Sequence, residues 1–244
     1  MKIITNRNHS YFIDDLTTAE LGSIIFDTDE NKMYIMLESG TLTEIAAENV
    51  GVETLEALTE AIAAGGKVIV SARIDAPTGF TITADTTVVN NGEITIKEDT
   101  EGNGVFLVTN GTLTLDGKGT INGLGNNIWS IAVWVKENGK LVINDGYFTN
   151  VGAKSEEDSD HFDLVYASGN AQIEINGGEF QCETPKWTLN IKDKDRATAS
   201  IIVKGGKFHG FNPANCEVEG ANTNFVAPGY KVVEIDGIFE VMPE

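Results

Sequence analysis

The sequence predicts an all-β protein whose larger part is a parallel β-helix, a stack of short β-strand repeats. Three observations lead to this prediction. Four segments between residues 111 and 208 align with one another, glycine is frequent at 26 residues while proline is scarce at 5, and short β runs alternate with turns rich in Gly and Asn. Only one segment has the pattern of an amphipathic helix, so helices cannot supply the core.

The first fifty residues differ from the rest and are expected to form an N-terminal attachment or neck region, residues 1–50. Two short β runs at 22–26 and 33–37 flank a segment of turn residues, which predicts a β-hairpin. The hairpin residues expected to make the attachment are Ile24, Ile25, Phe26, Tyr34 and Ile35.

A helix is predicted over residues 52–64, within a capping region at residues 51–66. Leu55, Leu58 and Ile62 recur at helical spacing on one face, and Gly65 follows the last turn. A helix this short is not stable alone in water, so its apolar face must cover another part of the protein. We expect it to cover the open end of the first β repeat, since an open edge invites association.

The repeats are assigned to residues 67–215. Segments 139–148, 171–180 and 200–208 align without a gap, and segment 111–121 aligns with one extra residue. Each is preceded by a second β run, at 105–108, 131–135, 162–166 and 187–191. The equivalent residues Leu115, Ile143, Ile175 and Val203 lie 28, 32 and 28 residues apart, so the repeat keeps its core and varies in its loops.

Stacking explains how these repeats could bury their apolar residues, because one unit cannot bury its own face. Strand alternation places Leu141 and Ile143 inward and Val142 outward, with the same pattern in the other copies. The aromatics Phe148, Phe180 and Phe208 are expected to form an internal stack, and Asp116, Asn144 and Asn176 to share a corner, where Lys204 departs from the pattern. A β-sandwich is the alternative, but its strands usually recur every 8–12 residues without gap-free similarity between units.

Residues 216–244 are expected to form a C-terminal cap. Two β runs at 230–234 and 238–241 flank Asp236-Gly237, which predicts a hairpin that closes the second open end.

The charge of the chain is strongly acidic, with 17 Lys and Arg against 37 Asp and Glu and a formal net charge of −20. Nucleic acid and anionic membranes would repel such a surface, and neither is an expected partner. No apolar stretch approaches the ~20 residues of a membrane span, residues 1–10 lack the apolar core of a secretory signal, and two cysteines make no disulfide framework. Residues 1–60 hold three basic and twelve acidic residues, so that end carries a net −9.

With these features together, the chain resembles the pectate-lyase-like right-handed β-helix of bacteriophage fibres and spikes, particularly those of phages of gut bacteria. The resemblance is carried by the helix at 55–62 with the following Gly65–Val70 segment, by the repeat at 187–213, and by the closing run at 226–233. It implies a virion structural protein made in the host cytoplasm: a homotrimeric head fibre or decoration, attached to capsid or tail proteins by its N-terminal part. Host surface glycan is a further expected partner, and no cofactor is implied.

A tailspike that depolymerises host polysaccharide is the alternative, and a bacterial surface adhesin is a third, weaker one. If the protein is an enzyme, Asp160 and Asp163 in the acidic segment 156–163 are the expected catalytic pair, because hydrolases of this fold use carboxylates on adjacent repeats. A solvated acidic loop explains the same residues. A lyase would need an arginine base, and the chain has three arginines, Arg7, Arg73 and Arg196; a charged turn with Asp193 and Asp195 explains Arg196.

Trp129 lies between two β runs and is a candidate for stacking on a glycan or contacting a neighbouring subunit, although burial against its own repeat is equally consistent with its position. No metal site is expected, since His9, His161 and His209 are far apart in the sequence.

Overall fold

The structure, a computed structural model, describes residues 3–6, 24–27, 32–38, 41–45, 51–96, 103–124, 130–153 and 162–244. The chain divides into two compact units, Met1–Gly51 and Val52–Glu244. Strands make up most of the regular secondary structure of the described residues, many of them in parallel sheets, which confirms the all-β prediction. Trp129 and Asp160 lie outside the described residues.

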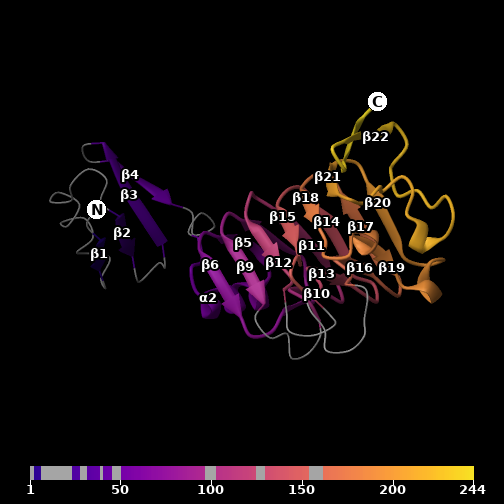
Figure 1. Cartoon of the computed structure of the whole chain (residues 1–244). Helices are drawn as coiled ribbons and strands as arrows, with labels where there is room; N and C mark the ends of the chain where they lie inside the picture. The colour runs from indigo at the N-terminus through magenta and orange to yellow at the C-terminus, as the bar shows by residue number, and fades with distance from the viewer. Residues whose placement is uncertain are drawn as a thin grey trace. The chain divides into compact units, whose positions relative to one another are not determined.

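The first unit contains a four-stranded sheet in the order β1-β2-β3-β4 (Figure 1). Its strands are β1 (Ile3–Asn6), β2 (Ile24–Asp27), β3 (Lys32–Glu38) and β4 (Thr41–Ile45). Strands β2 and β3 pair antiparallel, with Ile24 opposite Ile35 and Ile25 opposite Tyr34, which confirms the predicted hairpin. Strands β1 and β4, which extend the hairpin on either side, were not predicted.

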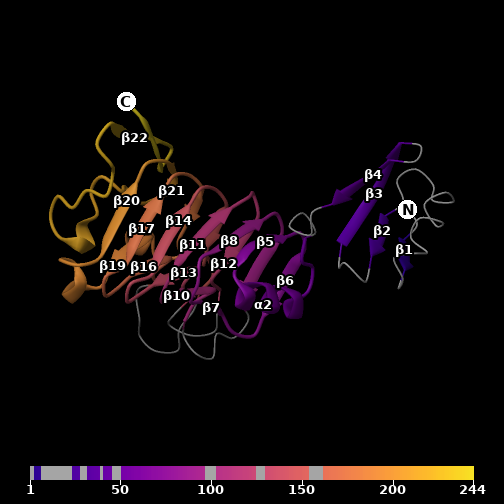
Figure 2. The ribbon, with the colours of Figure 1, turned by 180° about the vertical axis from the view of Figure 1, so that it is seen from behind.

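The second unit is built on three sheets whose strands run side by side in Figures 1 and 2. The six-stranded sheet contains β5 (Gly66–Val70), β8 (Thr86–Asn90), β11 (Thr112–Asp116), β14 (Lys140–Ile143), β17 (Gln172–Ile175) and β20 (Ser200–Val203). The five-stranded sheet contains β7 (Phe80–Ile82), β10 (Phe106–Val108), β13 (Val133–Val135), β16 (Val165–Ala167) and β19 (Leu189–Ile191). The eight-stranded sheet contains β6 (Arg73–Ala76), β9 (Glu93–Ile96), β12 (Thr120–Asn122), β15 (Tyr147–Thr149), β18 (Glu179–Gln181), β21 (Gly206–His209), β22 (Tyr230–Ile235) and β23 (Ile238–Pro243). From β7 to β21 the chain visits the five-, six- and eight-stranded sheets in turn, and equivalent strands pair in parallel.

The aligned repeats of the sequence are the paired strands of the structure. Leu115 lies opposite Ile143, Ile143 opposite Ile175, and Ile175 opposite Val203, all with buried side chains. The intervening Ile202 is 43% exposed, as expected for an outward position. The predicted aromatic stack is also confirmed: the Phe180 ring lies 5.0 Å from that of Phe148 and 4.7 Å from that of Phe208, nearly parallel to both.

Each complete repeat has three strands, one more than the sequence predicted. The residue expected to follow a Gly turn as a single internal aromatic lies in a short strand of its own, β15, β18 or β21. Positive φ angles of 122°, 97° and 108° at Gly146, Gly178 and Gly206 turn the chain into these strands. Strands of three or four residues carry too little alternation to be recognised from one sequence.

Helix α2 (Leu55–Ala64) starts later than predicted, because Val52 forms a parallel bridge with Val70 and thereby extends the edge of the six-stranded sheet. Thr54 caps the helix, its Oγ1 accepting a hydrogen bond from the Ala57 N–H at 3.2 Å. Leu58 and Ile62 are buried in the core at the β5 end of the sheets (Figure 1). This is the place in the fold that the sequence assigned to the helix.

At the opposite end of the three sheets, a different segment caps each of the terminal strands β19, β20 and β21. On β19, the Ile191 N–H donates to the carboxylate of Glu219, which lies in the short helix η4 (Glu217–Glu219). On β20, Val203 exchanges backbone hydrogen bonds with residues 225–227. On β21, strand β23 pairs antiparallel and carries β22 with it, which confirms the predicted C-terminal hairpin.

Candidate functional site

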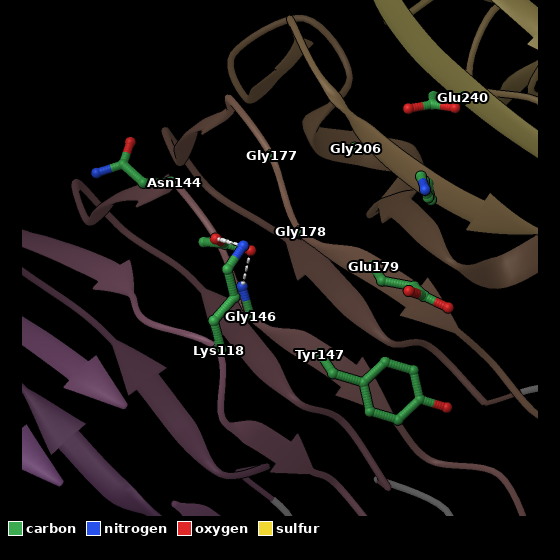
Figure 3. A pocket seen from close by; sticks show the side chains of 11 residues that line it. Lys118, Asn144, Gly146, Tyr147, Gly177, Gly178, Glu179, Gly206 and Glu240 are labelled. Carbon is green, nitrogen blue, oxygen red and sulfur yellow. Dashed lines mark hydrogen bonds and ion pairs between the residues drawn. The ribbon is translucent and has the colours of Figure 1, made fainter. Parts of the chain in front are cut away.

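The best candidate site is an open polar groove on the outer face of the eight-stranded sheet, with a volume of about 440 Å³ (Figure 3). It crosses strands β15, β18, β21 and β23 and the turns that precede the first three. Its lining residues are Lys118, Asn144, Asp145, Gly146, Tyr147, Gly177, Gly178, Glu179, Gly206, Lys207 and Glu240. We call it the β15–β21 groove.

The strand register places the central side chains of the groove in one row. Tyr147 lies opposite Glu179, Glu179 opposite Lys207, and Lys207 opposite Glu240 of β23. The next residue along β15, β18 and β21 is the buried phenylalanine of the internal stack, so the residue before it must face outward. The row of groove side chains is therefore fixed by the same packing that fixes the core.

Hydrogen bonds and ion pairs hold some of these side chains in place. The Tyr147 hydroxyl donates to Gln181 Oε1 at 2.5 Å, and Glu179 Oε1 lies 2.6 Å from His209 Nε2. Lys118 pairs with Asp145 at one edge of the groove. Within the described residues Lys207 and Glu240 form no ion pair, and both remain available to a ligand.

Glycines make the groove shallow and keep its backbone accessible. Gly146, Gly178 and Gly206 supply no side chains above the turns, so a ligand can lie close to the main chain there, but the Gly146 N–H and the carbonyls of Gly146 and Gly178 already have hydrogen-bond partners within the protein. Gly205, beside the groove, serves packing instead, because a Cβ on it would lie 2.1 Å from the carbonyl oxygen of Asn176. The groove thus offers one phenol ring and, on Lys207 and Glu240, two charged groups without an ion pair among the described residues, a set suited to binding a polar ligand.

Comparison of the chain with protein-family models, with curated proteins and with solved structures gives no match. The function must therefore be argued from the residues of the chain itself.

The predicted acidic site is only partly within the described residues. Asp163 is 9% exposed, and its Oδ1 accepts a hydrogen bond from Asn190 Nδ2 at 2.8 Å on the neighbouring repeat. Burial, and then the negative charge of Asp163, raises the pKa of Tyr166 to about 12. Asp163 therefore participates in a buried contact between repeats, away from the β15–β21 groove.

A second aromatic surface lies on the outward side of the five-stranded sheet and was not predicted. The rings of Trp134 and Tyr166, on neighbouring strands, are 5.7 Å apart, and Trp134 Nε1 donates to Ser168 Oγ at 2.9 Å. Lys136 Nζ lies 5.4 Å from the centre of the Trp134 ring. The two rings are thus held mainly by contacts within the protein.

Neither described arginine lies in the groove. Arg73 pairs with Asp75 and Glu93, each at 3.0 Å, on the exposed face of β6 and β9. Arg196 binds Asp193 at 2.9 Å, as the charged turn suggested, and also binds Glu219 at 2.8 Å, which was not predicted. The Glu219 side chain is 2% exposed and also holds the edge of β19, so Arg196 has a structural partner at the end of the sheets.

The two thiols are buried and free, and burial raises the pKa of Cys182 to about 12 and that of Cys216 to about 11. In the part of the chain that the structure describes, no three His, Cys, Asp or Glu side chains gather as a metal site would need. The same residues contain no helix long and apolar enough to cross a membrane.

The expected attachment residues lie on β2 and β3, at the centre of the four-stranded sheet of the first unit. The groove residues escaped the sequence reasoning, although one signal was present: Tyr147, Glu179 and Lys207 each stand between a turn glycine and a core phenylalanine. Comparing the residue between the turn glycine and the core phenylalanine in successive repeats identifies this row of groove side chains.

Proposed function

We propose that residues 66–209 form a right-handed parallel β-helix, and that the protein is a non-enzymatic virion structural protein of a bacteriophage, a trimeric head fibre or decoration. The observation that carries the proposal is the recurrence of one three-strand repeat in register, with equivalent side chains opposite each other in three sheets. Such a stack is rigid along its axis and presents long outer faces, which suits display on a particle surface.

The first unit is the proposed anchor. It has its own four-stranded sheet and is compact by itself, and its residues 1–51 hold nine acidic residues against three basic ones, a net charge of −6. We expect it to bind capsid or tail proteins through a surface with basic or amide groups, and the binding to weaken as salt screens the charges.

The β15–β21 groove is the proposed contact with host surface glycans. Tyr147 can stack on a sugar ring, while Lys207 and Glu240 can form hydrogen bonds with its hydroxyls. Titration of ¹⁵N-labelled protein with host-derived oligosaccharides tests this. Shifts should map to β15, β18 and β21 and disappear in Tyr147→Ala, while Tyr230→Ala, in the C-terminal hairpin, should leave them unchanged; shifts that survive Tyr147→Ala would exclude this groove as the glycan site.

Mass measurement and virion labelling test the structural role. Light scattering after size exclusion should give three times the chain mass of 26.2 kDa, and antibodies should decorate the head of intact particles. A monomer at micromolar concentration would refute the proposed trimeric fibre. Antibody label on the tail alone would show that the protein is a tail component rather than a head fibre. Deletion of residues 1–50 should abolish incorporation into virions without changing the β-type circular dichroism spectrum.

A polysaccharide depolymerase remains the second candidate, because the groove holds the carboxylates of Glu179 and Glu240 around a sugar-sized space, besides Asp145, which pairs with Lys118. Release of new reducing ends from host capsule, lost in Glu179→Gln or Glu240→Gln, would establish it. Loss of that activity in Asp163→Ala with an unchanged melting temperature would instead place the chemistry in the acidic segment.

A further inference from the structure

The charged side chains of the β15–β21 groove do not balance. Lys118 and Asp145 cancel, because they form an ion pair at one edge of the groove. The other three, Glu179, Lys207 and Glu240, lie on the neighbouring strands β18, β21 and β23. One lysine against two glutamates leaves a formal charge of −1 in the middle of the groove, with histidine counted as neutral.

The strand register fixes the order of these three charges. Glu179 lies opposite Lys207, and Lys207 lies opposite Glu240, so the lysine has a carboxylate on each side. Neighbouring strands are about 4.8 Å apart, and a charged ligand group near Lys207 is therefore about equally close to both glutamates. An anionic group there meets one attraction and two repulsions, whereas a cationic group meets two attractions and one repulsion.

The hydrogen-bonding capacity of the groove favours the same kind of ligand. Glu179 Oε1 lies 2.6 Å from His209 Nε2, but Glu179 Oε2 and both carboxylate oxygens of Glu240 form no side-chain hydrogen bond among the described residues. An ammonium group brings three donors to these acceptors, whereas a ligand carboxylate would bring further acceptors. Tyr147, which lies beside Glu179 in Figure 3, adds an aromatic ring that attracts a cation.

We propose that the β15–β21 groove binds glycans that carry a free amino group and discriminates against acidic glycans. The inference names the glycan class for the contact proposed above, and it rests on that contact. The net charge of −20 acts in the same direction, because it repels acidic polymers before they reach the groove. The preference among small sugars depends on Glu179, Lys207 and Glu240, and single substitutions in this row should therefore change it.

Three methyl β-cellobiosides that differ only at C6 of one ring separate the effect of charge from that of shape. The group at C6 is a hydroxyl, an amine or a carboxylate. Each sugar is titrated into the ¹⁵N-labelled full chain at about pH 8, at which histidine is neutral and a primary amine is charged. Because exposed ion pairs are weak, the amine should bind about threefold more tightly than the neutral sugar, and the carboxylate about threefold more weakly. Added salt should reduce both differences.

Charge variants of Glu240 test whether the groove causes this order of affinities. Glu240→Lys changes the formal charge of the row from −1 to +1 and should reverse the order, whereas Glu240→Gln brings it to zero and should make the three affinities equal. Glu234→Lys is the matched control, because it makes the same charge change at an exposed position of the neighbouring strand β22. Glu234 lies opposite Phe239, which packs against the core, so it is on the face of the hairpin away from the groove.

The order of the three affinities decides the outcome. Tightest binding of the amine, with the order reversed in Glu240→Lys and kept in Glu234→Lys, supports the inference. Equal affinities in the wild type, or tightest binding of the carboxylate, overturn it and leave the glycan contact in place. An order that the control also reverses overturns it too, because the overall charge of the chain would then be the cause.

Failure of all three sugars to shift the signals of β15, β18 and β21 would also overturn the inference. The proposed glycan contact fails with it only if the host-derived oligosaccharides leave those signals unchanged as well.

Discussion

Replacing Phe180 tests the internal aromatic stack on which the register of the repeats depends. The Phe180 ring is fully buried and lies between two nearly parallel rings, at 5.0 Å from Phe148 and 4.7 Å from Phe208. Truncating a buried phenylalanine to alanine costs about 3 to 5 kcal/mol, since the apolar contacts are lost and a cavity remains. Phe180→Ala should therefore lower the free energy of unfolding by about 4 kcal/mol.

Phe180→Leu separates the ring contacts from the buried volume. Leucine keeps most of the apolar volume but removes two ring contacts, each worth about 0.5 to 1.5 kcal/mol. The matched control is Phe106→Leu, because Phe106 is equally buried but has, among the described residues, a single ring neighbour, the tilted ring of Phe80 at 5.9 Å. The Phe180 variant should lose about 1 kcal/mol more than the control.

Guanidinium unfolding followed by far-UV circular dichroism measures both differences. The slope of the transition must be compared between variants, because long repeat arrays can lose two-state behaviour. A loss of less than about 1 kcal/mol in Phe180→Ala, or equal losses in the two leucine variants, would refute a cooperative stack at this position.

Three further predictions concern the turns, the end of the sheets and the thiols. Gly205→Ala should lower the free energy of unfolding in urea by more than about 2 kcal/mol, because its Cβ would lie 2.1 Å from the carbonyl oxygen of Asn176. The control Gly229→Ala should lower it by about 1 kcal/mol, because no atom lies within 4 Å there and only the φ of 82° disfavours a side chain. Equal losses in the two variants would exclude the steric explanation. Glu219→Ala should lower the free energy of unfolding by about 2 kcal/mol and speed amide exchange at Ile191, since it leaves that buried N–H without its acceptor, whereas Arg196 keeps Asp193 and the Val218 carbonyl; unchanged exchange there would contradict the role of Glu219. Between about pH 9 and pH 12 the free energy of unfolding should fall as the pH rises. The thiols ionise near their ordinary pKa of 9.0 in the unfolded chain, but burial raises the pKa to about 12 for Cys182 and about 11 for Cys216 in the folded protein. Cys182→Ala should weaken this pH dependence in thermal melts, and a pH profile identical to that of the wild type would contradict the contribution of Cys182.

The parts of the fold that the sequence predicted are those in which one requirement repeats. The sequence alone aligns Leu115, Ile143, Ile175 and Val203, because each must meet its equivalent in the next repeat and similar residues therefore recur. The hairpin of β22 and β23 was recognised from Asp236-Gly237, whose positive φ angles of 53° and 78° suit its tight turn.

The parts that were missed depend on single contacts between distant segments. Glu219 reaches back 28 residues to Ile191 and 23 to Arg196, and no local pattern marks that connection. The groove required knowing that Tyr147, Glu179 and Lys207 lie in one row and that Glu240 joins it from an antiparallel strand. Asp163 was chosen because acidic residues cluster near it in the sequence, but its burial beside Asn190 follows from tertiary packing.

The separate closure of the three last strands has a consequence for how such a protein can change its length. Glu219, residues 225–227 and β23 each recognise the edge of a final strand, and none of them contacts the middle repeats through the strand ladder. A whole repeat can therefore be added or removed between β11 and β20 without redesigning either terminus, and each change alters the reach of the stack by about 4.8 Å. Evolution and protein engineering can thus adjust the distance between helix α2 and the C-terminal hairpin in steps of one repeat.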